Sequence, residues 1–173
     1  MLYPDVAALP QPLQDALTSR APANIYRMVT HSPGMAIPFL EMADAIFAGN
    51  SLPADWRELA ILRVGHAYRA PYEIHHHERI ARRDGLSEAG IAAAATGSTD
   101  GLPAEYVEIL SWTDRLLAEH TLTGPDRDHA LTVLTVTQLA DLVLTVGFYQ
   151  LVCNFLNTFE VTTASELLAA DAS

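Results

Sequence analysis

The stretch Arg57–His77, RELAILRVGHAYRAPYEIHHH, contains two glutamates and a run of three histidines. Proline suits the first turn of a helix, because the amide hydrogen that it lacks would have no helical partner there. Pro53 and Pro71 therefore predict two consecutive helices, over 53–67 and 71–84. The stretch thus predicts a helical hairpin with a tight bend between its helices.

The rest of the chain also has the periodicity of helices. No segment alternates polar and apolar residues, and the apolar runs are too long for strands. Ser87 is a predicted N-cap, Thr135 with Gln138 a predicted capping box, and Gly85 a predicted helix-ending glycine. The predicted fold class is all-α, a bundle of seven or eight helices. Besides the hairpin, the expected helices cover 13–19, 35–48, 88–95, 103–119, 126–134 and 135–159, and a short apolar-periodic segment covers 23–28.

The chain has 173 residues, half of them hydrophobic, and this is enough to bury a core. No segment resembles a linker, so we expect a single domain over 1–173. Four prolines interrupt residues 1–23, which are expected to form an N-terminal extension.

The charge balance excludes several classes of function. The net charge is −11, whereas binding to a phosphate backbone depends on clustered cations, so we expect no nucleic-acid partner. All ten basic residues are arginine. Without lysine, the chain cannot form a Schiff base, attach pyridoxal phosphate or supply the lysine of a phosphate-binding loop.

Cysteine usage and hydropathy predict a cytoplasmic protein. Cys153 is the only cysteine, so no disulfide or CxxC pair can form within the chain, and we expect it to pack as a small hydrophobe. The N-terminus lacks the pattern of a signal peptide. Residues 139–156 are strongly apolar but are interrupted by Asp141, Gln150 and Asn154, which predicts a buried helix and no membrane partner.

Glu73 and His77 are the strongest acid–base pair, because residues four apart share one face of a helix. The three consecutive histidines cannot converge on one metal ion, since neighbouring helical side chains point about 100° apart. A metal site would need ligands from elsewhere, such as His31, His66 or Glu58, and no known ligand framework is present. We therefore expect no metal, and solvated or interface positions for His75 and His76.

Glu58 has two readings. It is either an exposed helix residue or an inward-facing carboxylate that meets Glu73 and His77. If the three meet in an apolar pocket, the carboxylates would raise each other's pKa and His77 would titrate near neutrality, as proton-transfer sites require. Arg63 would either clamp a substrate carboxylate or pair with a neighbouring acid. Tyr149, with Asn154, could place a hydroxyl group at a pocket.

The runs RELAILRVGHAY and YEIHHHERIARRDGLSEAGIAA resemble the core of the carboxymuconolactone decarboxylase family, within the alkylhydroperoxidase-D-like superfamily. The resemblance extends upstream through NIYRMVTHSPGMAIPFLEMADAI and downstream through LADLVLTVGFYQLVCNFLNTF, covering roughly 24–159. It implies an all-α fold that assembles as a homo-oligomer, either a dimer, a trimer or a hexamer.

The resemblance also implies roles for individual residues. In the peroxidase branch a glutamate and a histidine matching Glu58 and His77 serve a CxxC pair, whose positions are taken here by Ala70 and Glu73. Without thiols the dithiol cycle cannot run, so peroxidase activity is disfavoured. The decarboxylase branch needs no cofactor and often has Tyr-Glu-Trp-x-x-His, which Tyr72, Glu73 and His77 match with isoleucine in place of tryptophan. Tyr72 is accordingly a further candidate for substrate binding.

The leading hypothesis is a cofactor-free lyase (decarboxylase) or isomerase acting on a small anionic organic acid or lactone. His77 would be the general acid/base, Glu73 its partner carboxylate and Glu58 a supporting one. The alternatives are a non-catalytic oligomeric protein that binds a small molecule and, less favoured, a metal-dependent enzyme.

Overall fold

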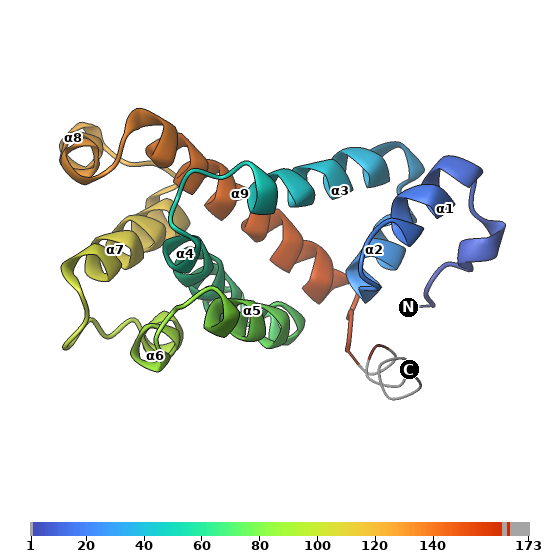
Figure 1. Ribbon diagram of the computed structural model, residues 1–173, viewed down its shortest axis with the longest axis horizontal. Coiled ribbons are helices and arrows are strands. Elements are labelled where there is room, and N and C mark those ends of the chain that lie inside the picture. Colours follow the sequence, from blue (N-terminus) through green and yellow to red (C-terminus); the bar gives the residue numbers. More distant parts are fainter. Residues whose placement is uncertain (1, 164–165, 167–173) are drawn as a thin grey trace. The chain divides into compact units, whose positions relative to one another are not determined.

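The computed structural model describes residues 2–163 and 166, and these residues are helical, without strands (Figure 1). The all-α prediction is confirmed. Eight of the nine α-helices have eight or more residues, and the ninth, α2, is the short apolar-periodic segment expected at 23–28. The helices are α1 (Gln11–Thr18), α2 (Asn24–Val29), α3 (Pro33–Ala48), α4 (Ala54–Ala67), α5 (Pro71–Arg83), α6 (Glu88–Thr96), α7 (Ala104–Glu119), α8 (Gly124–Val133) and α9 (Val136–Thr158).

The chain divides into two compact units. One combines Met1–Gly49 with Leu156–Ser173, and the other is continuous over Asn50–Phe155. In the first unit α3 packs against α1 and α2. The second unit contains the hairpin of α4 and α5 and every residue of the candidate site described below.

The predicted helix ends are confirmed by their hydrogen bonds. Ser87 Oγ accepts a hydrogen bond from the amide of Gly90, at 3.1 Å, and caps α6. At the start of α9 the amide of Gln138 donates to Thr135 Oγ1 at 3.1 Å, while the amide of Thr135 donates to Gln138 Oε1 at 3.0 Å. Gly85, with φ of +94°, follows the last residues of α5. Local chemistry alone therefore determines these boundaries.

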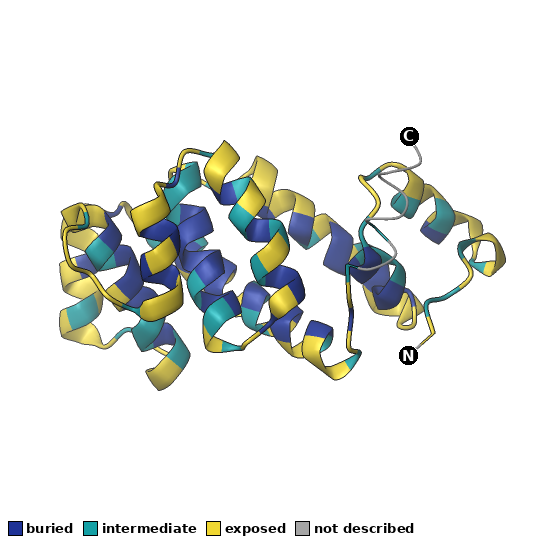
Figure 2. Cartoon of the chain, turned by 90° about the horizontal axis from the view of Figure 1, so that it is seen from below, coloured by how far each residue is buried: buried dark blue, intermediate teal, exposed yellow. Residues whose placement is uncertain are grey.

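Helix α4 is the core of the second unit. It packs against α5, α6 and α7, and its residues 59–62 are completely buried. Figure 2 shows that buried and exposed residues lie on different faces of the same helices. A helix that is packed on three sides by other helices needs apolar side chains on most of its surface, which explains the continuous run LAIL. Because α4 is held on three sides, the side chains that it directs toward α5 have little freedom to move.

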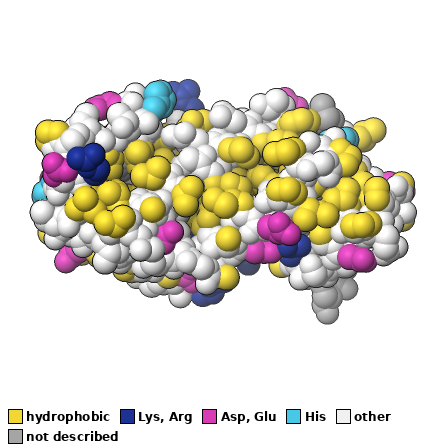
Figure 3. Space-filling view, turned by 90° about the horizontal axis from the view of Figure 1, so that it is seen from above, with side chains coloured by type: hydrophobic (Ala, Val, Ile, Leu, Met, Phe, Trp, Pro, Cys, Tyr) yellow, Lys and Arg dark blue, Asp and Glu magenta, His cyan; other side chains and the backbone are white. Residues whose placement is uncertain are grey.

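Helix α9 was expected to be buried, and the structure buries only part of its surface. Among the described residues it is the helix whose length and hydropathy would suit a membrane span, a property shared by core helices of soluble proteins. Asp141 accepts hydrogen bonds from the amide and hydroxyl groups of Ser51, at 2.7 and 2.6 Å. Four large apolar side chains of α9 are exposed: Val136, Val143, Leu144 and Leu151. Figure 3 shows apolar side chains at the molecular surface on the face seen from above.

Candidate active site

The hairpin of α4 and α5 brings Glu58, Glu73 and His77 together. Nδ1 of His77 donates a hydrogen bond to Oε2 of Glu58 at 2.7 Å, and Nε2 lies 2.9 Å from Oε1 of Glu73. The Glu58 side chain is fully buried, and those of Glu73 and His77 are 5% and 7% exposed. Of the two readings of Glu58, the structure therefore shows the inward-facing one.

The close approach of the two helices depends on the residues between them. Gly65 faces α5, where a Cβ atom would be in ordinary van der Waals contact, 3.4 Å from Ile74 and 3.5 Å from Glu73, and a longer side chain would meet both residues. The bend is completed by Arg69, whose φ is +51°, and by a hydrogen bond from the amide of Ala70 to the carbonyl of Gly65. A small residue and a tight turn thus set Glu73 against α4.

The two nitrogens of His77 have different contacts. The Nδ1 contact is a directed hydrogen bond, whereas Oε1 of Glu73 accepts no well-aligned hydrogen bond despite lying 2.9 Å from Nε2. We treat the second contact as a charge–charge interaction, because hydrogen bonds weaken steeply as the donor angle closes. Glu58 therefore orients the ring, and Glu73 Oε1 is a buried acceptor that pairs with the charge of the ring without a directed hydrogen bond.

His77 is protonated at neutral pH. Burial lowers its pKa, but the negative charge of Glu73 and the hydrogen bond to Glu58 outweigh burial and raise the pKa to about 10. The expectation that His77 titrates near neutrality is wrong. It considered mainly the repulsion between the two carboxylates and not the attraction of each carboxylate for the charged imidazole ring. Both of them contact the same imidazole ring and stabilise its charged form.

Arg57 and Asp84 extend this network and were missed in the sequence. Nε of Arg57 donates to Oε1 of Glu58 at 3.1 Å, and Nη2 donates to Oδ2 of Asp84 at 2.8 Å. Charges alternate along the series Asp84, Arg57, Glu58, His77 and Glu73, and three negative and two positive groups leave a net charge of −1. The available signal was their placement, since an antiparallel hairpin opposes the start of its first helix to the end of its second.

Helix α9 supplies an apolar wall. The ring of Tyr149 meets the His77 ring edge-to-face, with centroids 5.0 Å apart. Cys153, one turn later, is fully buried, and burial together with the charge of Glu73 raises the pKa of its thiol. The thiol is therefore neutral and behaves as the predicted small hydrophobe.

Residues 33–114 match the family model described as the carboxymuconolactone decarboxylase family. This part of the chain belongs to the carboxymuconolactone decarboxylase family. The matched segment runs from the start of α3 into α7 and includes Glu58, Glu73 and His77. No curated protein matches the chain.

The family includes decarboxylases and alkylhydroperoxidase-D-like proteins. Ala70 is fully buried and Glu73 nearly so, and by the sequence resemblance these two residues take the positions of the two cysteines of the peroxidases. A carboxylate thus occupies one thiol position and lies against the histidine. The constellation retains proton-transfer groups without a dithiol.

The structure gives the other two candidates for substrate binding, Arg63 and Tyr72, partners outside the Glu58, Glu73 and His77 group. Arg63 pairs with Asp114, with Nε 2.6 Å from Oδ1, and also donates to the carbonyl of Ala94. Of its two predicted roles, the structure shows pairing with a neighbouring acid, so Arg63 is not retained as a substrate clamp. Tyr72 is buried, and its ring lies 4.5 Å from that of His76. Within the described residues, no three His, Cys, Asp or Glu side chains form a group suited to a metal ion.

Proposed function

We propose that the protein is a cofactor-independent lyase or isomerase that acts on a small organic acid or lactone. His77 would be its general acid and Glu73 its general base, with Glu58 orienting the ring. The observation that carries this proposal is a buried imidazolium between two carboxylates, with only one of them forming a directed hydrogen bond to it. A charged histidine held out of bulk water can deliver a proton to carbon without losing it first to solvent.

For decarboxylation, the proposed chemistry requires one proton donor. Cleavage of the bond between the substrate carbon and its carboxylate releases carbon dioxide, and the electron pair moves into the adjacent carbonyl to form an enolate. Nε2 of His77 then donates its proton to the carbon. A proton from water restores the imidazolium, so one proton is consumed for each carbon dioxide released.

For isomerisation, Glu73 and His77 act in turn, one removing a proton from the substrate and the other returning one. Oε1 of Glu73 removes a proton next to the carbonyl, and His77 returns a proton to another carbon of the same enolate. The proton on Glu73 then passes to Nε2, 2.9 Å away, which restores both groups. The first step requires the substrate's acidic hydrogen to replace Nε2 of His77 at Oε1, a contact that is close but is not a directed hydrogen bond. Oligomerisation and a cytoplasmic location are part of the same proposal.

The test is a panel of lactone acids and intermediates of aromatic degradation, assayed for carbon dioxide release and for isomerisation. Turnover that is lost in both His77→Ala and Glu73→Ala would support the assignment. Turnover that is unchanged in both variants would show that the reaction takes place elsewhere.

A second candidate is a non-catalytic protein that binds a small molecule in the same site. The replacement of both family cysteine positions, by Ala70 and Glu73, favours it, because such substitutions end the peroxidase reaction and leave the fold intact. Calorimetry with the same panel distinguishes the two candidates. Binding without any turnover would favour the second candidate, and measurable turnover would exclude it.

A further inference from the structure

Arg57 is a buried arginine that the proposed chemistry does not use. Its side chain is 7% exposed, and its guanidinium contacts two carboxylates, those of Glu58 and Asp84. Oε1 of Glu58 accepts from Arg57, and Oε2 accepts from His77. Each oxygen of this fully buried carboxylate therefore has its own cationic donor, and Glu58 cannot rotate without breaking both contacts.

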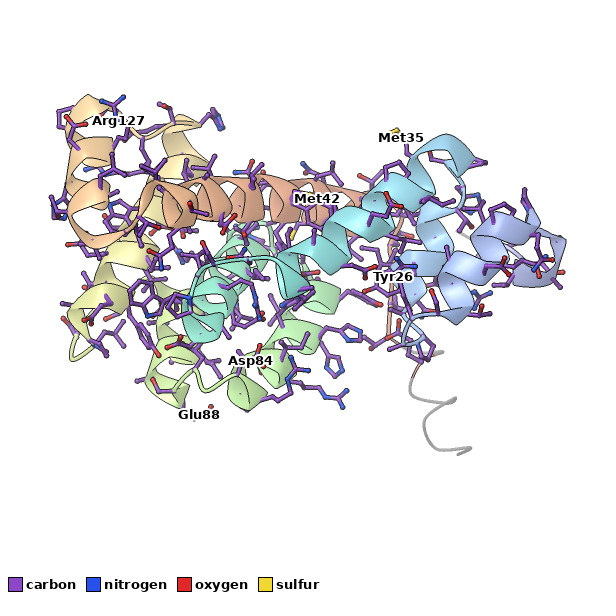
Figure 4. All side chains as sticks on the ribbon, turned by 45° about the horizontal axis from the view of Figure 1, so that its top comes forward. Tyr26, Met35, Met42, Asp84, Glu88 and Arg127 are labelled. Atoms are coloured by element: carbon purple, nitrogen blue, oxygen red, sulfur yellow. The ribbon has the colours of Figure 1, made fainter. Side chains whose placement is uncertain are left out.

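Asp84 fixes the other end of the guanidinium. It is the C-cap residue of α5 and is labelled at the end of that helix in Figure 4. Its Oδ2 accepts from Arg57, while its Oδ1 accepts from Nε of Arg83 at 2.8 Å. Arg57 thus connects Asp84, at the end of α5, with Glu58 on α4, and each of these carboxylates has a second side-chain donor, Arg83 and His77 respectively.

We propose that Arg57 is a positioning residue for His77, acting through Glu58 and held in place by Asp84. This role rests on the proposed function, because it concerns how the proton donor of that site is prepared. Arg57 keeps Glu58 on Nδ1, so that Nε2 is the nitrogen left for Glu73 and the substrate. Together with Asp84 it also sets the charge that the imidazole ring experiences.

The two partners have opposite electrostatic effects on His77. The ring contacts Glu58 on α4, Glu73 on α5 and the ring of Tyr149 on α9. The buried Cys153 thiol on α9, whose pKa is raised by burial and by the charge of Glu73, is neutral. Removing the positive charge of Arg57 leaves Glu58 less compensated, which stabilises the imidazolium. Removing the negative charge of Asp84 leaves Arg57 more available to Glu58, which destabilises the imidazolium.

The experiment measures the His77 titration by NMR of protein labelled at histidine, in the wild type and in two variants. We expect the midpoint to rise in Arg57→Gln and to fall in Asp84→Asn, each by about one pH unit, as for one unit charge changed close to a buried group. Arg57→Lys keeps the charge, but an ammonium group cannot donate to both carboxylates in the planar geometry of a guanidinium. Its midpoint should therefore lie between those of Arg57→Gln and the wild type. Arg115→Gln is the matched control. It removes an arginine of α7 that pairs with Asp126 of α8, outside the hairpin, and should leave the midpoint unchanged.

Opposite shifts together with incomplete recovery in Arg57→Lys would support the positioning role, because the charge of Arg57 acting alone would be fully replaced by lysine. An unchanged midpoint in both variants, or a parallel change, would overturn it. If Arg57→Gln does not fold, Asp84→Asn and Arg57→Lys still give a sign and a partial rescue. The titration needs no substrate, so failure of the proposed function would appear only in turnover assays, and failure of this inference only in the titration.

Discussion

The pH dependence of folding stability follows directly from the His77 environment. In the unfolded chain a histidine titrates near its ordinary value of 6.5, whereas in the folded protein the pKa of His77 is raised to about 10. Between these values the folded protein holds one proton that the unfolded chain has released. The free energy of unfolding should therefore fall as pH rises, by about 1.4 kcal/mol per pH unit for this group.

The sign is fixed by the direction of the shift. The contribution is fully present below the unfolded value and is lost as pH rises through the folded value. Over about two pH units, from about pH 7 to about pH 9, the expected loss is about 3 kcal/mol. His66, the other histidine with a shifted pKa, contributes little to the slope in this window. Burial lowers its pKa, so it is largely neutral above pH 7 in both the folded and the unfolded state.

Urea unfolding followed by circular dichroism at several pH values within this window measures the slope. The variant His77→Gln lacks the titrating group, so its slope should be close to zero between about pH 7 and about pH 8. Nearer to about pH 9 the buried Cys153 thiol, whose pKa is raised, adds a smaller loss of stability that wild type and variant share. The exposed neighbour His75 provides the matched control, and His75→Gln should keep the wild-type slope. Equal slopes in wild type and His77→Gln would refute the claim that His77 folds as a buried imidazolium.

Three further predictions concern catalysis, helix ends and assembly. Glu73→Gln keeps the shape of the side chain but removes the proposed base, so we expect turnover of an identified substrate to fall about 100-fold or more, with normal thermal unfolding; undiminished turnover would contradict the role. Ser87→Ala removes the N-cap of α6 and should cost about 1 kcal/mol in urea unfolding, and no loss would argue against the observed cap. Leu144 and Leu151 are exposed seven residues apart on one face of α9, so we expect the protein to sediment as a homo-oligomer. The double variant Leu144→Glu, Leu151→Glu should sediment as a smaller species, and a monomeric wild type would refute this assembly.

Several features of the site could be predicted only as alternatives. The sequence placed Glu73 and His77 on one helix face, since their spacing of four residues is sufficient for that. It left open whether Glu58 faced the same way, because that depends on how α4 is rotated against α5. Arg63 shows the same limitation: its charge suited either a substrate or a neighbouring acid, and the packing of α4 against α7 supplied Asp114.

By itself the sequence determined the all-α class, the caps at Ser87 and Thr135, and the pairing of Glu73 with His77. These depend on local periodicity and on hydrogen bonds that span a few residues. The tertiary structure alone decided that Arg57 and Asp84 complete the network and that the pKa of His77 is raised. Residues far apart in the chain must meet in a buried space before their charges act strongly on one another, and the antiparallel hairpin of α4 and α5 brings them there.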